Sequence, residues 1–313
     1  MEVGESIFAF ENRVEFIKLH PQHTRIMYST PWMSDIVVGT MRWGLWDAKF
    51  TTAQYEEIIA HAMELGFSTF DHADIYGDHT TEAEFGAALK LHPDWRSNME
   101  IVTKCGIIRV CDQKPNHYIK AYDFTKEHII QSAEDSLRNL CTDYIDVLLL
   151  HRPDVLMDPD EVGEAFEQLY QSGKVRSFGV SNFTPSQVKL LQTTVPIGVH
   201  QIEVSVKEVS AFDDGRLDQC IIDNIIPMAW SPLGGGSLPD PLMNTLTAMA
   251  KDFGVSPQVL AIAWLLQHPS GILPVTGTSK KERLTEVREA LNIQLDRQQW
   301  YSIYQASTGT SLP

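Results

Sequence analysis

The chain has 313 residues, of which 43% are hydrophobic and 21% are charged, as in water-soluble globular proteins with a core to bury. Its net charge of −16 disfavours binding to nucleic acid or to anionic membranes, because their phosphates attract basic surfaces. An anionic ligand still fits wherever a local basic cluster receives it.

Targeting signals and cysteine pairs are the next features to consider. The N-terminal stretch MEVGESIFAFENRVEF is interrupted by charges, which is not typical of a secretion signal. The longest apolar run, 259–266, is too short to cross a bilayer. Cys105, Cys111, Cys141 and Cys220 have neither CxxC nor zinc-ligand spacing. They suit a reducing cytosol, so we expect a cytoplasmic protein in which Cys105 and Cys141 pack as small apolar side chains.

From about residue 35 the sequence alternates between strand and helix patterns. Strand runs rich in β-branched residues are predicted at 36–41, 68–73, 99–106, 144–154, 174–182, 198–205, 225–236 and 272–278. Helices are predicted at 51–66, 80–91, 125–140, 158–173, 184–192, 215–224, 240–254, 256–268, 280–292 and 297–307. A long polar loop is predicted at 107–124.

Eight strand–helix units in one chain favour an α/β fold of the (β/α)8 TIM-barrel type over an open sheet. Residues 1–313 are predicted to form a single domain. Within it, residues 1–34 stand outside the repeat, and the segments FIKLHP and Ile26–Tyr28 suggest an N-terminal hairpin. The helices after the eighth strand are extra C-terminal elements.

Reactive side chains follow three neighbouring strands of this predicted barrel. Asp71 ends the second strand, and Tyr76 follows in the next loop. Lys104 lies at the end of the third strand and His151 at the end of the fourth. Each alone suits a turn or a solvated surface. Because the carboxyl ends of barrel strands converge on one mouth, the four together favour an active site.

These residues lie in motifs that resemble the aldo-keto reductase superfamily, in the order FDHADIYG, IVTKCG, LLLHRPD, FGVSNF and AWSPLGGG. The wording is most similar to the bacterial branch of broad-specificity or uncharacterised NADPH-dependent reductases, and the match runs from about residue 35 almost to the end. The resemblance implies reduction of aldehydes or ketones, with hydride from a nicotinamide and a proton from Tyr76. Lys104 would lower the pKa of Tyr76, Asp71 would keep Lys104 charged, and a neutral His151 would position the carbonyl.

No GxGxxG motif follows a strand, so barrel loops rather than a Rossmann domain would hold the cofactor. The resemblance implies that Ser181, Asn182 and Gln201 bind the carboxamide and that Trp230 stacks on the nicotinamide. Further contacts fall into three groups: Gly39, Thr40 and Met41 beside the nicotinamide; Ser231, Pro232, Leu233 and Gly234 at the pyrophosphate; and Thr278, Ser279, Lys280 and Arg283 at the 2′-phosphate and adenine. The basic third group favours NADPH, with NADH as the alternative.

Two points depart from or extend this pattern. By the resemblance, an Asn that faces adenine stands a little beyond the glutamate, whereas Glu286 is followed here by Val287. The substrate, a small carbonyl compound, is expected to meet a rim made by Trp43, Trp46, the 107–124 loop with His117 and Tyr118, and the 206–214 segment.

Two other functions are alternatives to this one. A non-catalytic NADPH-sensing regulatory subunit could use the same fold, although the complete tetrad argues against it. A metal-dependent hydrolase would need an HxH or paired-carboxylate cluster at the strand ends, and the sequence has none there, so no metal is expected. The protein is expected to be a monomer or a weak oligomer.

Overall fold

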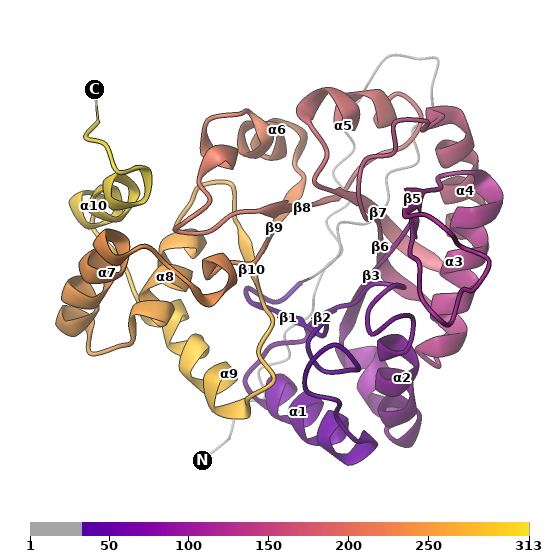
Figure 1. Ribbon diagram of the computed structural model, residues 1–313, viewed down its shortest axis with the longest axis horizontal. Coiled ribbons are helices and arrows are strands. Elements are labelled where there is room, and N and C mark those ends of the chain that lie inside the picture. Colours follow the sequence, from indigo (N-terminus) through magenta and orange to yellow (C-terminus); the bar gives the residue numbers. More distant parts are fainter. Residues whose placement is uncertain (1–32, 313) are drawn as a thin grey trace, which may run out of the picture.

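The computed structural model describes residues 33–312, and Figure 1 shows them as a closed barrel of parallel strands with helices around it. The strands follow the order β1-β10-β9-β8-β7-β6-β3-β2 around the barrel. Their bounds are β1 (Val37–Gly39), β2 (Thr69–Asp71), β3 (Glu100–Cys105), β6 (Ile145–Leu150), β7 (Val175–Ser181), β8 (Val199–Glu203), β9 (Ile226–Trp230) and β10 (Leu273–Thr276). The predicted (β/α)8 barrel is therefore confirmed, while the expected hairpin segments FIKLHP and Ile26–Tyr28 lie outside the described residues.

Several of the helices begin at polar side chains that cap their first turn. The α-helices are α1 (Thr52–Glu64), α2 (Thr81–Leu91), α3 (Lys126–Asn139), α4 (Pro159–Gln171), α5 (Pro185–Leu191), α6 (Arg216–Asp223), α7 (Asp240–Phe253), α8 (Pro257–Leu266), α9 (Lys281–Arg288) and α10 (Arg297–Thr308). The Thr51 and Thr184 side chains accept hydrogen bonds from the third backbone N–H of α1 and α5, and each forms a reciprocal capping box. Such caps satisfy N–H groups that have no partner within the helix.

Apolar side chains fill both sides of the barrel wall. Every residue of β6 is buried, as expected for a strand with barrel interior on one face and helices on the other. The barrel interior is packed by Val37, Val102, Val147, Leu149, Val199, Met228 and Val275. The carboxyl ends of the strands are left to polar residues, and that end of the barrel carries the candidate site.

The structure corrects several sequence predictions near this end. The 107–124 segment is not only a loop, because Ile107–Ile108 (β4) pairs antiparallel with Ala121–Tyr122 (β5). The strand predicted at 225–236 is shorter: β9 ends at Trp230, because Ser231 has a φ of 51° and turns the chain out of the sheet. Cys141 was expected to be buried but is exposed just after α3, and its φ of 52° belongs to the turn that ends this helix.

The C-terminal helix α10 is joined to α8 by a pair of tryptophans. The rings of Trp264 and Trp300 stack with centroids 4.7 Å apart, and each indole N–H donates to the backbone oxygen of the other residue at 3.0 and 3.1 Å. Phe212, in the segment after β8, packs its ring edge against both. The Tyr304 hydroxyl donates to the neighbouring Asp213 carboxylate at 3.1 Å. Helix α10 therefore anchors the 206–214 segment.

A buried histidine in β8 makes the fold sensitive to acid. Burial lowers the pKa of His200 from 6.5 to about 3, and neither ring nitrogen has a hydrogen-bond partner among residues 33–312. The folded state holds this ring neutral while the unfolded chain takes up a proton near pH 6.5, so stability falls as the pH drops from about 6.5 towards 3.

Replacing His200→Leu should reduce the loss of unfolding free energy between pH 7 and pH 5 by about 2 kcal/mol. Urea unfolding at both pH values measures this loss, and an unchanged difference would contradict the assignment.

Candidate active site

The four residues predicted for catalysis lie together at the carboxyl end of the barrel. Asp71 is the last residue of β2, Lys104 lies near the end of β3, and His151 directly follows β6. Because β3 pairs with both β2 and β6, these three positions are adjacent around the barrel. Tyr76 reaches them from the loop after β2, where its backbone N–H donates to the Ala73 oxygen at 3.0 Å.

The ammonium group of Lys104 is the centre of this cluster. The side chain is fully buried, and Nζ donates to the two carboxylate oxygens of Asp71 at 2.8 and 2.9 Å. The same nitrogen donates to the backbone oxygen of His72 at 2.6 Å and to the Tyr76 hydroxyl at 3.1 Å. A buried ammonium is costly unless it is paired and hydrogen-bonded, and here Asp71 supplies the opposite charge.

The pKa shifts follow from this burial. Burial raises the pKa of Tyr76 above its ordinary value of 10.0, by more than the neighbouring Lys104 charge lowers it. This direction is opposite to the lowered pKa expected from the sequence, because water is excluded from the phenol as well as from the lysine. Burial also acts to lower the pKa of Lys104, but Asp71 and Tyr76 outweigh it and raise that pKa. Both groups are therefore protonated at neutral pH.

His151 faces the same cluster as a neutral ring. Its centroid lies 6.1 Å from that of Tyr76, edge to face, and its Nδ1 atom is buried without a partner among the described residues. Burial, with the positive charges of Lys104, Arg152 and Lys120, lowers its pKa well below 6.5. The expectation of a neutral imidazole agrees with this direction. A neutral ring beside Tyr76 can donate a hydrogen bond to an oxygen bound between them.

Two residues predicted for cofactor binding also support the tetrad. Gln201 in β8 donates from Nε2 to an Asp71 carboxylate oxygen at 2.9 Å, across the mouth of the barrel. Thr40 donates to the Asp71 backbone oxygen from both its N–H and its hydroxyl, each at 3.0 Å. Its hydroxyl also lies 3.0 Å from Nδ1 of His72. The sequence reasoning missed these contacts, since they depend on the β1–β2 register and on closure of the barrel.

The residues predicted for the nicotinamide end come together beside the tetrad. Asn182, which leaves β7 with a φ of 63°, donates from Nδ2 to the Ser181 hydroxyl at 2.7 Å. Its Oδ1 accepts from the Trp230 indole N–H at 2.8 Å. Gly39 and Thr40 are buried at the end of β1, and Met41 is exposed just beyond. This arrangement holds the half-buried Trp230 ring at the mouth.

The remaining predicted cofactor residues lie on two loops. Ser231, Pro232 and Leu233 lead from β9 into Gly234–Gly236 (η3), whose three glycines all have positive φ. Lys207 closes against this loop, donating from Nζ to the Ser237 backbone oxygen at 3.2 Å. Within this turn the Gly234 and Gly236 N–H groups already donate to the backbone oxygens of Ser231 and Leu233, at 2.8 and 2.9 Å, so the turn is closed on itself.

The second loop precedes α9. Thr278 and Ser279 are half-buried, while Lys280 and Arg283 are exposed at the N-terminal end of the helix. Lys281 is instead paired with Glu57 at 2.9 Å. Val287, which stands near the position where the resemblance implies an asparagine, is buried in the core.

The predicted rim needs one correction. Trp43 is fully buried, with its indole N–H donating to the Thr278 backbone oxygen at 2.9 Å, so it does not line the mouth. Trp46 does reach it, because its ring lies edge to face with Tyr76 at 5.9 Å and is partly exposed.

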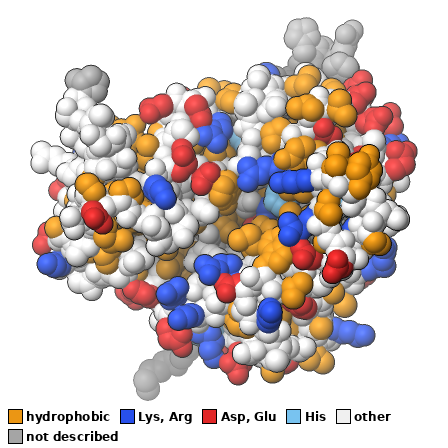
Figure 2. Space-filling view, viewed as in Figure 1, with side chains coloured by type: hydrophobic (Ala, Val, Ile, Leu, Met, Phe, Trp, Pro, Cys, Tyr) orange, Lys and Arg blue, Asp and Glu red, His pale blue; other side chains and the backbone are white. Residues whose placement is uncertain are grey.

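Tyr118 is 87% exposed at the tip of its loop. Figure 2 shows a hollow near the middle of this face, with histidine atoms inside it and Lys and Arg atoms beside it.

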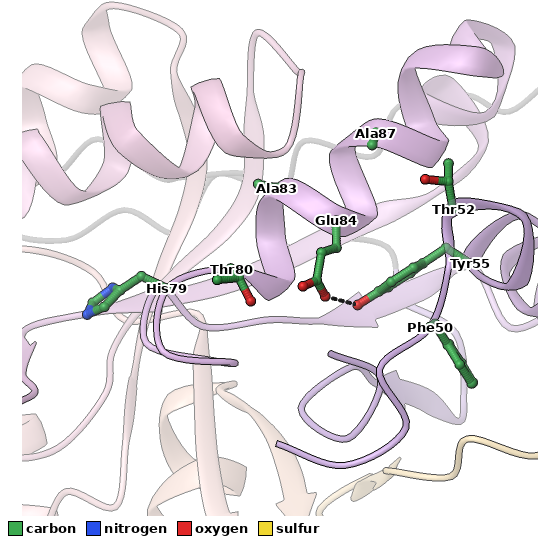
Figure 3. A pocket seen from close by; sticks show the side chains of 8 residues that line it. All are labelled: Phe50, Thr52, Tyr55, His79, Thr80, Ala83, Glu84 and Ala87. Atoms are coloured by element: carbon green, nitrogen blue, oxygen red, sulfur yellow. Dashed lines mark hydrogen bonds between the residues drawn. The ribbon is translucent and has the colours of Figure 1, made fainter. Parts of the chain in front are cut away.

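A separate groove of about 410 Å³ lies on the outer surface between α1 and α2. Figure 3 shows its lining, in which the Tyr55 hydroxyl donates to Glu84 at 2.9 Å. The tetrad residues take no part in it. Within the described part of the chain no group of His, Cys, Asp or Glu is arranged to hold a metal ion, and no helix there is long and apolar enough to span a membrane.

Comparisons with known proteins place the chain in a family. The family model described as "Aldo/keto reductase family" matches residues 35–308. Oxidoreductase YdhF of Escherichia coli K12 is 44% identical over 300 residues, covering 93% of this chain and 99% of that protein. A 6-dehydroglucose reductase of Agrobacterium fabrum is 42% identical, covering 88% and 95%. A crystal structure of an aldo/keto reductase from Klebsiella pneumoniae, in complex with NADP and acetate, has a TM-score of 0.73 at 26% identity, covering 87% and 90%. The chain belongs to the aldo/keto reductase family.

Proposed function

We propose that this protein reduces aldehydes or ketones to alcohols with NADPH, using Asp71, Tyr76, Lys104 and His151. The observation that carries the proposal is the fully buried Lys104 ammonium, held by Asp71 and donating to the Tyr76 hydroxyl at 3.1 Å. A purely structural ion pair would not need a phenol at the open end of the barrel. The NADP complex of the Klebsiella relative supports the choice of cofactor, and the activity of the Agrobacterium relative supports an aldehyde substrate.

The residues at the mouth fit a nicotinamide nucleotide. Trp230 is held by Asn182 with its ring partly free, and the Gly234–Gly236 turn lies directly after it along the chain. When bound, the nucleotide would supply the hydride that reduces the carbonyl carbon. Ser181, Asn182, Gln201 and Trp230 would hold the nicotinamide end, and Thr278, Ser279, Lys280 and Arg283 the adenosine end.

The chain itself would manage the proton. His151, neutral because of its lowered pKa, would donate a hydrogen bond to the carbonyl oxygen and orient the substrate. Tyr76, protonated because of its raised pKa, would give its proton to the oxygen as negative charge develops there. Lys104 would then stabilise the phenolate left behind, and Asp71 would hold Lys104 in place. Solvent would return the proton to Tyr76 before the next turnover.

The second candidate is the non-catalytic NADPH sensor. The hydrogen bonds from Lys104 to Asp71 and to the Tyr76 hydroxyl, with His151 facing the Tyr76 ring, favour the reductase. Purified protein should oxidise NADPH when a panel of aldehydes and ketones is added, as followed by absorbance. Tight NADPH binding without turnover of any carbonyl compound would favour the sensor instead.

Cofactor choice can be tested at the start of α9. Replacing Arg283→Ala should weaken NADPH binding by about tenfold, because a guanidinium bound to the 2′-phosphate forms a charge-assisted hydrogen bond. NADH lacks this phosphate, so its affinity should change by less than about twofold. Fluorescence titration with each nucleotide measures both values. The matched control is Lys281→Ala, since Lys281 lies at the same helix end but pairs with Glu57. Equal losses for the two nucleotides would place the 2′-phosphate elsewhere.

A further inference from the structure

Arg152 follows His151 at the end of β6 and has no role in the reaction described above. It is half-buried, and its guanidinium carbon lies 5.3 Å from the centre of the Trp230 ring. Trp230 ends β9, so Arg152 extends from the histidine of the tetrad towards the residue proposed to border the nicotinamide. No hydrogen bond or ion pair holds this guanidinium anywhere in residues 33–312; its one contact of a specific kind there is the Trp230 ring.

Other arginines around the mouth are neutralised. Arg109 pairs with Asp78 at 2.6 Å, and Arg216 pairs with Asp214 at 2.6 Å. The chain has 41 acidic and 25 basic residues, yet no acidic side chain between residues 33 and 312 pairs with Arg152. A half-buried guanidinium has lost part of its hydration, so an unpaired one is unfavourable unless a ligand completes it.

The charge of Arg152 also reaches the reacting groups. It contributes to the lowered pKa of His151, together with Lys104 and Lys120, and acts to lower the pKa of Tyr76. Arg152 also acts to lower the pKa of Glu203 at the end of β8, although residues 33–312 contain no ion pair between these two side chains. Arg152 and Lys120 therefore make the mouth beside His151 locally positive in a protein of net charge −16.

We propose that Arg152 determines specificity by binding a carboxylate of the substrate, so that the preferred substrates are small carbonyl compounds carrying an anionic group. This inference rests on the proposed reductase function and names the substrate class of the same site. The planar guanidinium matches a carboxylate with two parallel hydrogen bonds, and Trp230 holds its face without using its N–H groups. With the carboxylate at Arg152, the carbonyl of a short substrate would lie towards Tyr76 and His151.

The test uses 2-, 3- and 4-carboxybenzaldehyde, each beside its methyl ester, with NADPH as the reductant. The rigid ring places the carboxylate at three different distances from one reacting aldehyde, and the ester removes only the charge. The wild-type protein should reduce at least one acid with a kcat/KM at least tenfold above that of its ester. Arg152→Gln should lower kcat/KM for that acid by about 10- to 100-fold, mainly through KM, and leave the ester within about twofold. Arg152→Lys should retain part of the preference, because it keeps the charge but loses the paired geometry.

Controls separate the sources of any change. Arg138→Gln removes the same charge from an exposed position on α3 and should alter neither substrate. If Arg152→Gln lowers acid and ester equally, or acts by raising the KM for NADPH, Arg152 serves the nucleotide and the inference is wrong. It is equally wrong if the wild-type protein reduces the esters, or a neutral hydroxylated aldehyde such as D-glyceraldehyde, better than any of the acids. Failure to reduce these aldehydes together with every aldehyde and ketone of the panel named above would overturn the proposed function itself.

Discussion

Replacing Tyr76 with phenylalanine should lower kcat for carbonyl reduction by about 10²- to 10⁴-fold, the usual contribution of a positioned general acid. The change removes the hydroxyl that accepts from Lys104 at 3.1 Å and keeps the ring that packs against Trp46 and His151. NADPH affinity should stay within about twofold, because the residues proposed to hold the nucleotide lie on other strands and loops. Activity comparable to that of the wild-type protein would mean that another group delivers the proton.

Steady-state kinetics on one aldehyde and nucleotide titration by fluorescence measure the two effects separately. Tyr55→Phe is the matched control, since it also removes one buried tyrosine hydroxyl, here the one that donates to Glu84 in the outer groove. This control should retain full turnover. A similar loss of kcat in both variants would point to a general effect on packing and not to proton transfer.

Replacing Lys104 with methionine should abolish turnover and cost about 3–5 kcal/mol of unfolding free energy, the range for breaking a buried ion pair at one partner. The variant leaves the Asp71 carboxylate buried beside an apolar side chain, and within the described residues Gln201 is then the one remaining donor to that carboxylate. It also removes the donor to the His72 backbone oxygen. Urea unfolding near pH 7 measures the loss.

The double variant Asp71→Asn with Lys104→Met separates charge from packing. Neutralising the stranded carboxylate should recover much of the lost stability and none of the activity. Lys126→Met is the surface control, because its pair with Glu164 is open to solvent and should be worth about 0.5 kcal/mol or less. If the single and double variants are equally unstable, the loss comes from packing around the lysine side chain.

The architecture and the tetrad were predictable from the sequence for a physical reason. Strands that are buried on both faces read as continuous apolar runs, and the reactive residues Asp71, Lys104 and His151 stand where those runs stop. Eight such runs predict a barrel, and the carboxyl ends of barrel strands meet at one mouth. The three residues are therefore expected to lie close together. Tyr76 could be added because its distance from Asp71 along the chain is short.

Other features depended on distances that no local pattern contains. Trp43 was assigned to the rim because it follows a strand, but the turn after β1 buries its ring and gives its N–H to Thr278, 235 residues away. The raised pKa of Tyr76 depends on how completely the closed barrel excludes water. Arg152 has no signal in the sequence, because what separates it from Arg109 and Arg216 is the lack of an acidic partner among residues 33–312. That lack is visible only in three dimensions.

The tryptophan pair that joins α8 and α10 also connects the C-terminus to the mouth. Trp300 and Tyr304 hold the 206–214 segment through Phe212 and Asp213, and Lys207 in that segment closes on the loop that follows Gly234–Gly236. Elements that depend on one another in this way open and close as one cooperative unit. Fraying of the last helix would thus spread to the glycine turn, so sequence changes in α10 would alter how long the nucleotide proposed to bind there stays in place, without contacting it.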